Sequence, residues 1–385
     1  MSTFDYYFYY YSAIFSGYPL VIKVAIFIIL ILLSLIVISF FRFFYIRRKQ
    51  ILEEKRKRKI NKRYREKLID ILYFSFQELN IVDLEDDNDL KEPKNGWQKR
   101  MLTYLILDIK ADKSFEIDGG VFQNKNYYNL LSYTKLFDYW INEISSRNTS
   151  KAIKALRMAN EIGEGIRGSA FSRSVHHRNS YLRKLARMTF TRFDAHAPYK
   201  FLEKGFDSQF NKFDERRLHY TLIEVNKDHP IPLLSKWITS TTNENYCSFL
   251  IREMGFFRQE EGIPFLIELY RKEQSQQIQG QIMMTLGELK YEPLIDLIKE
   301  EFKFASLPLQ TNMIIGLKKL NSKSCLPFMT EAYYNTQFSE IKIQIVELLK
   351  EFDQAGLQIL TSLSKKSSSK FENNLFAYAL NYPHI

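Results

Sequence analysis

The chain has 385 residues, of which 45% are apolar and 15% aromatic, and this composition excludes an intrinsically disordered protein. Only 14 glycines and 10 prolines interrupt it, which favours long helices over an all-β fold. The two cysteines, Cys247 and Cys325, are too few for a disulfide framework, and no Cys/His cluster has the spacing of zinc ligands. We therefore predict an all-α protein without a metal site.

The net charge of +11 belongs to one segment of the chain. Between Arg42 and Lys67 there are 13 lysines and arginines against three glutamates, a local excess of 10. The 41 residues before this run are neutral, and residues 68–385 carry only +1. A nucleic-acid-binding domain is usually strongly basic, so nucleic acid is not the expected partner of this larger part.

The first predicted element is a transmembrane helix over residues 20–46. Residues 24–41 form a run of 18 without a charge, which is long enough to cross a bilayer. A cleaved signal peptide is the rival interpretation, but it requires a basic start and small residues at its cleavage site. The first 22 residues lack Lys and Arg, and the bulky sequence FFRFF ends the run. We expect an uncleaved anchor preceded by a short extracytoplasmic segment, residues 1–19.

The basic run predicts the orientation of this anchor, because basic flanks stay in the cytoplasm. The N-terminus is expected outside and the C-terminal domain in the cytoplasm, at the inner (cytoplasmic) membrane of a bacterium. The run should contact anionic lipid; a nucleic-acid-binding arm is the alternative. The predicted lipid contacts are Arg47, Arg48, Lys49, Lys55, Arg56, Lys57, Arg58 and Lys59.

After the anchor, helical patterns dominate. We predict a polybasic juxtamembrane helix over 47–82, an acidic linker over 83–96, and a helical region over 97–164. The helices expected there have the sequences WQKRMLTYLILDIKAD, NYYNLLSYTKLFDYWINEISS and TSKAIKALRMANEI. Gly163, Gly165 and Gly168 form a G-x-G-x-x-G that follows a helix instead of a strand. This motif is therefore interpreted as a turn between helices, closed by a left-handed glycine.

A repeat is visible over residues 165–385. Two apolar residues spaced i, i+3 recur in steps of 31 or 32 residues, and each pair lies near the end of a predicted helix. A second helix follows, often with proline in its first turn, where no backbone donor is lost. A generic helical bundle, the rival interpretation, need not keep a fixed period. The pairs are Phe190/Phe193, Leu222/Val225, Met254/Phe257, Leu286/Leu289, Leu317/Leu320 and Leu349/Phe352.

Segments such as IMMTLGELKYEPLIDLIKEEF and FLIREMGFFRQEEGIPFLIELYRKE resemble HEAT repeats. The resemblance covers residues 180–385 and extends back to Trp97, although Gln358 and Lys200 stand where the proline is expected. It implies an α-solenoid of helix–turn–helix units with a period of about 32 residues, and it brings no catalytic residues. The membrane-anchored bacterial type further implies a link to envelope polysaccharide synthesis, with a membrane glycosyltransferase as partner.

One stretch of this region is basic. No acid occurs between Gly165 and Phe193, and Arg183 and Arg187 share a helix face. The stretch is either a solvated basic surface or an anion site for a lipid headgroup, a nucleotide, nucleic-acid phosphate or an acidic patch. The adjacent His176 and His177 point about 100° apart on a helix, so no metal site is predicted. The candidate residues are Arg167, Arg173, His176, Arg178, Arg183, Lys184, Arg187 and Arg192.

The sequence contains no nucleophile elbow, P-loop, kinase signature or spaced carboxylate pair. We therefore expect a non-enzymatic scaffold or adaptor that binds a membrane-associated protein, without cofactor or small-molecule substrate. The alternative is binding of nucleic acid, nucleotide or anionic lipid through the basic face from Arg173 to Arg192. A lyase built on such repeats is a third possibility, but no acid–base pair supports it.

Overall fold

The computed structural model describes residues 3–75, 77–78, 93–163, 165–203, 205–273, 275–367 and 369–381. Over these ranges the secondary structure is helical and contains no strand, which confirms the all-α prediction. The chain divides into two compact units, Met1–Tyr139 and Trp140–Ile385. Most of the predicted acidic linker, residues 83–92, lies outside the described residues.

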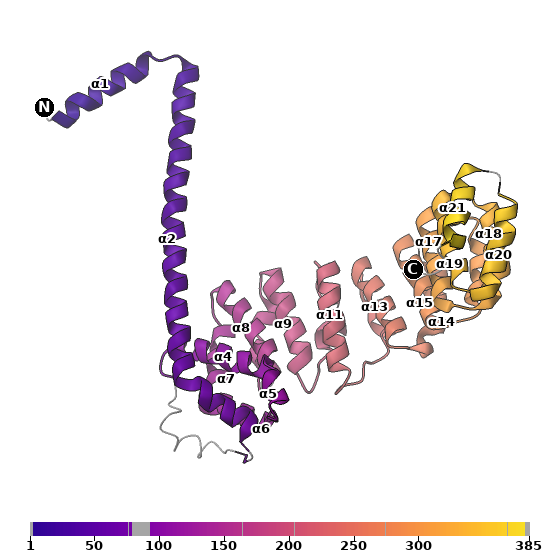
Figure 1. Ribbon diagram of the computed structural model, residues 1–385, viewed down its shortest axis with the longest axis horizontal. Helices are drawn as coiled ribbons and strands as arrows, with labels where there is room; N and C mark the ends of the chain where they lie inside the picture. Colours follow the sequence, from indigo (N-terminus) through magenta and orange to yellow (C-terminus); the bar gives the residue numbers. More distant parts are fainter. Residues whose placement is uncertain are drawn as a thin grey trace. The chain divides into compact units, whose positions relative to one another are not determined.

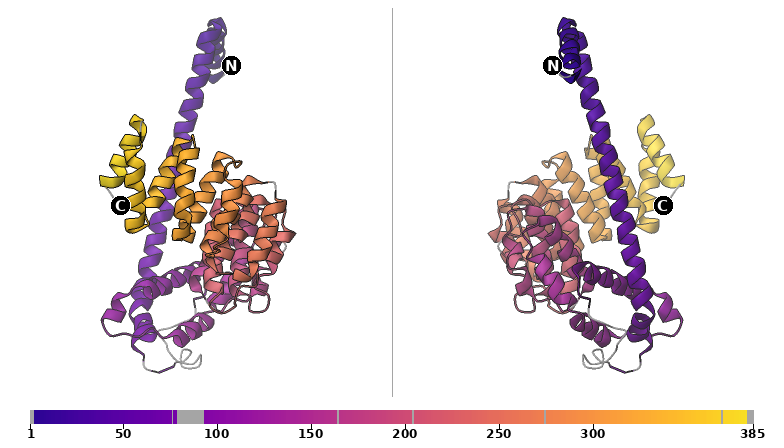
Figure 2. Two further views of the ribbon diagram at one scale, coloured as in Figure 1. Left: turned by 90° about the vertical axis from the view of Figure 1, so that its right-hand side faces the viewer. Right: turned by 90° about the vertical axis from the view of Figure 1, so that its left-hand side faces the viewer.

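The first unit contains one very long helix. After α1 (Thr3–Gly17), helix α2 runs from Leu20 to Ile69 without a break (Figures 1 and 2). Its sequence contains no Gly or Pro, and its second half is rich in the strong helix formers Glu, Lys and Arg. The most apolar 18-residue window has a mean hydropathy of 3.3, and none of it is buried. Helix α2 is therefore long and apolar enough to cross a membrane.

The juxtamembrane helix is shorter than predicted. The α-helical geometry ends at Ile69 and is followed by a π-helical turn, η1 (Asp70–Phe74), whereas the sequence predicted helix to residue 82. The carbonyl groups of Leu72 and Tyr73 accept hydrogen bonds from the backbone N–H groups of Gln123 (2.8 Å) and Val121 (3.0 Å). Because these carbonyls bind another segment, they cannot continue the helical ladder.

Among the described residues between η1 and Ile144 there are four further helices. Helix α4 begins with a capping box between Asn95 and Gln98, close to the start predicted at Trp97. It packs against α2. The helix predicted over 126–146 is divided into two at Lys135, whose φ of 53° is left-handed. The helices are α4 (Gly96–Ala111), α5 (Ser114–Ile117), α6 (Asn124–Tyr133) and α7 (Leu136–Ile144).

The second unit begins within α7. Helix α8 coincides with the helix predicted over 149–162, and Gly163, with a φ of 82°, caps it in the left-handed conformation that the sequence predicted. The elements are α8 (Thr149–Ile162), η2 (Gly168–Phe171), η3 (Ser174–His176), α9 (Ser180–Phe193), α10 (Lys200–Glu203), α11 (Lys212–Val225), α12 (Ser235–Ser240), α13 (Glu244–Phe256), η4 (Glu260–Gly262), α14 (Ile263–Lys272), α15 (Gln276–Glu288), α16 (Leu294–Glu301), α17 (Leu307–Leu320), η5 (Lys323–Cys325), α18 (Leu326–Asn335), α19 (Ser339–Lys350), α20 (Asp353–Lys365) and α21 (Lys370–Asn381).

Longer helices of this unit pack against one another in chain order. Helices α8, α9, α11, α13, α15, α17 and α19 each contact the next, and Figure 1 shows α8, α9, α11 and α13 side by side. Pro264 and Pro327 stand in the first turns of the shorter helices α14 and α18. One apolar core runs from Met188 to Ala379. Five residues of the predicted pairs are fully buried in it: Leu222, Met254, Leu286, Leu317 and Leu349.

Glycine allows two of these helices to approach closely. A Cβ atom on Gly287 of α15 would overlap the backbone carbonyl of Gly316 on α17. A Cβ atom on Gly316 would in turn lie 2.7 Å from the carbonyl oxygen of Met283. At Gly255 of α13 the contact is looser, because a Cβ atom would lie 3.2 Å from the Thr285 methyl group. The backbones of α15 and α17 therefore touch at the glycine pair.

Candidate functional site

Two of the predicted basic residues meet a buried carboxylate. Asp207, whose side chain is only 1% exposed, accepts hydrogen bonds from Nε (2.7 Å) and Nη2 (3.0 Å) of Arg183. Arg187 lies 3.6 Å from the same carboxylate and donates to the carbonyl of Val175. Burial acts to raise the pKa of Asp207, but the hydrogen bonds and positive charges of the arginines outweigh it and lower that pKa. Both arginines are therefore held inside the unit.

Lys184 forms a second buried pair. Its ammonium group lies 2.6 Å from the Asp214 carboxylate and donates to the carbonyl of Gln209 at 3.0 Å. Both side chains of the pair are 8% exposed. Asp214 also accepts from the backbone of Asn211 and so closes the capping box of α11. The charge of Lys184 thus fixes α9 to the start of α11.

The remaining candidates lie at the surface. Arg173 donates to the carbonyl of Ser145, and Arg192 donates to that of Asn160. The structure therefore separates the predicted set of eight into three internally compensated cations and five exposed residues: Arg167, Arg173, His176, Arg178 and Arg192. The anion-binding role predicted for the set remains a prediction, and for Arg183, Lys184 and Arg187 it would have to compete with Asp207 and Asp214.

The predicted lipid contacts are also divided. Arg56 stacks over the ring of Trp97 at 5.2 Å, and Lys57 pairs with Asp108 at 3.1 Å. Because α2 is one helix, Lys55 lies about 20 Å along its axis from Arg42, beyond the screening length of physiological salt. Direct lipid contact is therefore expected chiefly from the three residues nearest the apolar segment: Arg47, Arg48 and Lys49.

A groove crosses four helices of the second unit. It encloses about 570 Å³ between α11, α13, α15 and α17, and we call it the α11–α17 groove. Two of its lining residues, Thr285 and Glu288, face Gly255 of α13. The lining residues are Arg216, His219, Tyr220, Arg252, Glu253, Phe256, Thr285, Glu288 and Lys319.

A buried glutamate holds the centre of this groove. Glu253 is fully buried, and its Oε2 lies 2.7 Å from Nδ1 of His219. Its Oε1 lies 3.3 Å from Nη2 of Arg252. The Nη1 atom of the same arginine lies 2.9 Å from Glu215. The ring of His219 packs edge-on against Phe256, with ring centroids 4.6 Å apart. These contacts fix the side chains of α11 and α13 relative to each other.

The rim of the groove presents aromatic and basic side chains. Tyr220 is 68% exposed and Phe256 is 49% exposed. Arg216 is exposed, and Lys319 pairs with Glu288 at 3.0 Å. Arg252 and Lys319 are paired with carboxylates, and Arg216 is the rim cation that forms no ion pair within the described residues.

The chemistry of the groove suits binding. Thr285 is the only aliphatic hydroxyl among the lining residues, and it donates its hydrogen to the carbonyl of Ile251 at 3.1 Å. The Thr285 hydroxyl is therefore directed to a backbone carbonyl and not to His219. In the described part of the chain, no group of three His, Cys, Asp or Glu residues could hold a metal ion. Burial raises the pKa of the Cys247 thiol to about 12, which disfavours the reactive thiolate.

This groove was not predicted from the sequence, although one signal for it is present there. Glu253 occupies an apolar position of the sequence FLIREMGFF, between Ile251 and Met254. A buried acid in such a pattern requires a partner, and His219 lies 34 residues earlier, about one repeat away. A search for polar residues at core positions one repeat apart would have paired them.

Comparison of the sequence with known protein families gives no match. No curated protein sequence matches it either.

Proposed function

We propose that this protein is a non-enzymatic adaptor, anchored by α2 in the inner membrane with its N-terminus outside and its second unit in the cytoplasm. We propose further that the second unit is a HEAT-like α-solenoid that binds a partner protein through the α11–α17 groove. The apolar, unburied part of α2 supports the anchor. The stacking of α8 to α19 in chain order, each on the next, supports the solenoid.

The rim of the groove is the observation that carries the binding function. Tyr220, Phe256 and Arg216 are exposed together above a rigid base, and Tyr and Arg are among the residues that dominate binding energy at protein interfaces. Because the base of the groove is already fixed, it loses little conformational entropy when a partner binds. The positive charge at the rim favours a partner with an acidic patch.

Anion binding through the basic face has less support. Arg183, Lys184 and Arg187 would have to give up Asp207 or Asp214 to bind a phosphate, and each of these carboxylates is buried. Breaking a buried ion pair costs about 3–5 kcal/mol. A phosphate bound only by the exposed arginines would break no buried pair. Its binding would be weak, because a surface ion pair contributes about 1 kcal/mol or less.

The groove is tested by photocrosslinking in native membranes. A photoreactive amino acid in place of Tyr220 should capture one protein stoichiometrically, whereas the same group in place of the exposed Lys272 of α14 should not. Adding Arg216→Glu should reduce the yield about tenfold, since reversing a charge at an interface costs more than 1.4 kcal/mol. Arg271→Glu, on an exposed position outside the groove, is the matched control. Equal yields at Tyr220 and Lys272 would contradict the proposal.

The anchor is tested by extraction and thiol labelling. Full-length protein should stay in the membrane through an alkaline wash, and deletion of residues 20–46 should release it. With Ser12→Cys, a membrane-impermeant thiol reagent should label intact spheroplasts; with Thr242→Cys it should label them only after lysis. The buried Cys247 and Cys325 should give little background. Labelling of Thr242→Cys in intact cells would reverse the orientation.

A further inference from the structure

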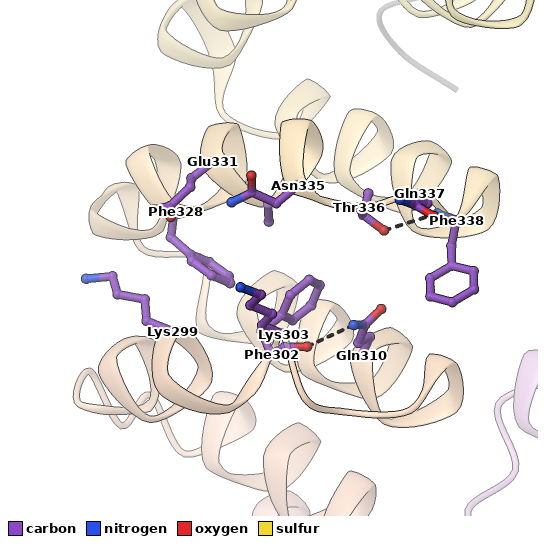
Figure 3. Close-up of a pocket in the computed structure, with 11 residues that line it drawn as sticks. Lys299, Phe302, Lys303, Gln310, Phe328, Glu331, Asn335, Thr336, Gln337 and Phe338 are labelled. Carbon is purple, nitrogen blue, oxygen red and sulfur yellow. Dashed lines mark hydrogen bonds between the residues drawn. The ribbon is translucent and has the colours of Figure 1, made fainter.

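A second pocket lies between the layer of α16 and α17 and the layer of α18 and α19. It encloses about 340 Å³, at the small end of the range for ligand pockets. Phe302 and Phe328 form its apolar wall, their ring centroids 5.5 Å apart in an edge-to-face arrangement. Phe338, 46% exposed, stands at its rim (Figure 3).

Gln310 lines this pocket, and among the described residues only the nitrogen atom of its side-chain amide has a hydrogen-bond partner. The side chain is 6% exposed, and its Nε2 donates to the carbonyl of Phe302 at 2.8 Å. The Oε1 atom is shut off from bulk water and accepts no hydrogen bond within the described part of the chain. Since the carbonyl of Phe302 requires a donor, the amide oxygen must face the other way. Figure 3 shows the Gln310 amide directed into the space between the two layers.

Such an arrangement points to a ligand that donates a hydrogen bond. A buried acceptor without a partner costs about 1–3 kcal/mol, so a donor that reached Oε1 would recover this energy. The apolar wall indicates that the donor is carried by an aromatic ring, since aromatic pairs add attraction beyond the area that they bury. A ring reaches the buried Oε1 only when the side chains that cover it move aside, and Phe338, which is 46% exposed at the rim, is the side chain that we expect to move.

Two lysines and one glutamate flank the mouth of the pocket. Lys299 and Lys303 flank it, opposed by Glu331. Lys299 has an exposed partner in Asp296 at 3.0 Å, while Lys303 forms no ion pair within the described residues. An acidic group beside the ligand's ring would therefore meet a complementary charge at Lys303.

We propose that this pocket binds a tryptophan side chain within an acidic segment of a partner protein. The indole N–H is a donor with no lone pair of its own to satisfy, so it matches the lone acceptor of Gln310. The ring packs against Phe302 and Phe328, and the neighbouring acidic residues face Lys303. The inference rests on the proposed function only in that the partner is a protein, because none of these residues lines the α11–α17 groove.

The test compares two peptides on the full-length protein in lipid nanodiscs. One is the capped peptide Gly-Asp-Trp-Asp-Gly; in the other, benzothienylalanine replaces tryptophan, so that a sulfur atom stands in place of the N–H group in a ring of the same shape. Dissociation constants from NMR titration should favour the tryptophan peptide about tenfold, the ratio that one buried hydrogen bond provides. Equal affinities, or no binding by either peptide, would overturn the proposal.

Variants locate the effect on the protein. Gln310→Met should remove the tenfold preference, whereas Gln344→Met should preserve it. Gln344 is the matched control because it too has a buried Oε1 without a partner in the described structure, but lies on α19 outside the pocket. Lys303→Glu should weaken both peptides several-fold. A preference that survives Gln310→Met would place the peptide elsewhere. The peptide comparison on the unaltered protein holds even if Gln310→Met fails to fold.

The peptide result is independent of the crosslinking result. Peptide binding without a crosslink at Tyr220 would support the proposed ligand of the pocket and contradict the proposed role of the α11–α17 groove. A crosslink at Tyr220 without peptide binding would support the role of the groove and contradict the proposed ligand of the pocket.

Discussion

Gly287→Ala is expected to lower the free energy of unfolding by about 3 kcal/mol or more. Overpacking a core costs 1–3 kcal/mol when side chains can yield, but here the new Cβ atom would meet the backbone carbonyl of Gly316, which cannot rotate away. Helix propensity alone would predict a gain of up to about 1 kcal/mol. The sign of the effect therefore tests whether α15 and α17 touch backbone to backbone.

Gly255→Ala is the matched comparison on the neighbouring helix. Its Cβ atom would meet the side chains of Thr285 and Glu288 at 3.2–3.3 Å, and these can shift by a few tenths of an ångström. We expect a change within about 1 kcal/mol. Urea unfolding of both variants, followed by circular dichroism, gives the comparison. A Gly287→Ala protein as stable as the unmodified chain would contradict the close approach.

Asp207→Asn should also be strongly destabilising, at a cost of about 3–5 kcal/mol. The substitution preserves the shape of the side chain but removes the carboxylate that compensates Arg183 and Arg187. The loss is costly because both arginine side chains are mostly buried. Asp296→Asn is the control, since Asp296 is 78% exposed and pairs only with Lys299. Its removal should cost less than about 1 kcal/mol. Urea unfolding at neutral pH measures both. Similar losses would show that Asp207 does not hold α9.

The pH dependence of stability should follow from the same carboxylate. The pKa of Asp207 is lowered in the folded protein, so its contribution is fully present above the unfolded-state pKa of about 3.9. As the pH falls from there through the lowered native pKa, the unfolded chain binds the extra proton and the contribution is lost. The stability difference between the unmodified chain and Asp207→Asn should therefore shrink below about pH 4. A difference that stays constant from pH 6 to 3 would assign the effect to another group.

Local patterns predicted the helices well. The apolar run predicted the first half of α2, and the caps at Asn95 and Gly163 mark where α4 begins and α8 ends. The early end of α2 has a tertiary cause. Helix α2 ends early because the carbonyls of Leu72 and Tyr73 bind residues some 50 positions later in the chain, and no local pattern shows such a contact.

The candidate sites were harder to predict, because they depend on which charges meet. The sequence showed that Arg183 and Arg187 share a face, but it could not show that Asp207, on a loop 20 residues away, would compensate them. The groove around Glu253 and the pocket at Gln310 both place a polar group in an apolar pattern. Only the packing of neighbouring helices decides whether such a group is paired.

The unbroken backbone of α2 has a mechanical consequence for the first unit. Arg56 and Lys57 fix α4 to the same helix that carries the apolar segment, with no hinge between Leu20 and Ile69. Each residue of an α-helix advances the azimuth by about 100°. The direction in which α4 leaves the helix axis is thus coupled to the rotation of the apolar segment, and one inserted residue would turn it by more than a quarter of a revolution. A rotation of the apolar segment about the α2 axis would therefore turn α4 by the same angle.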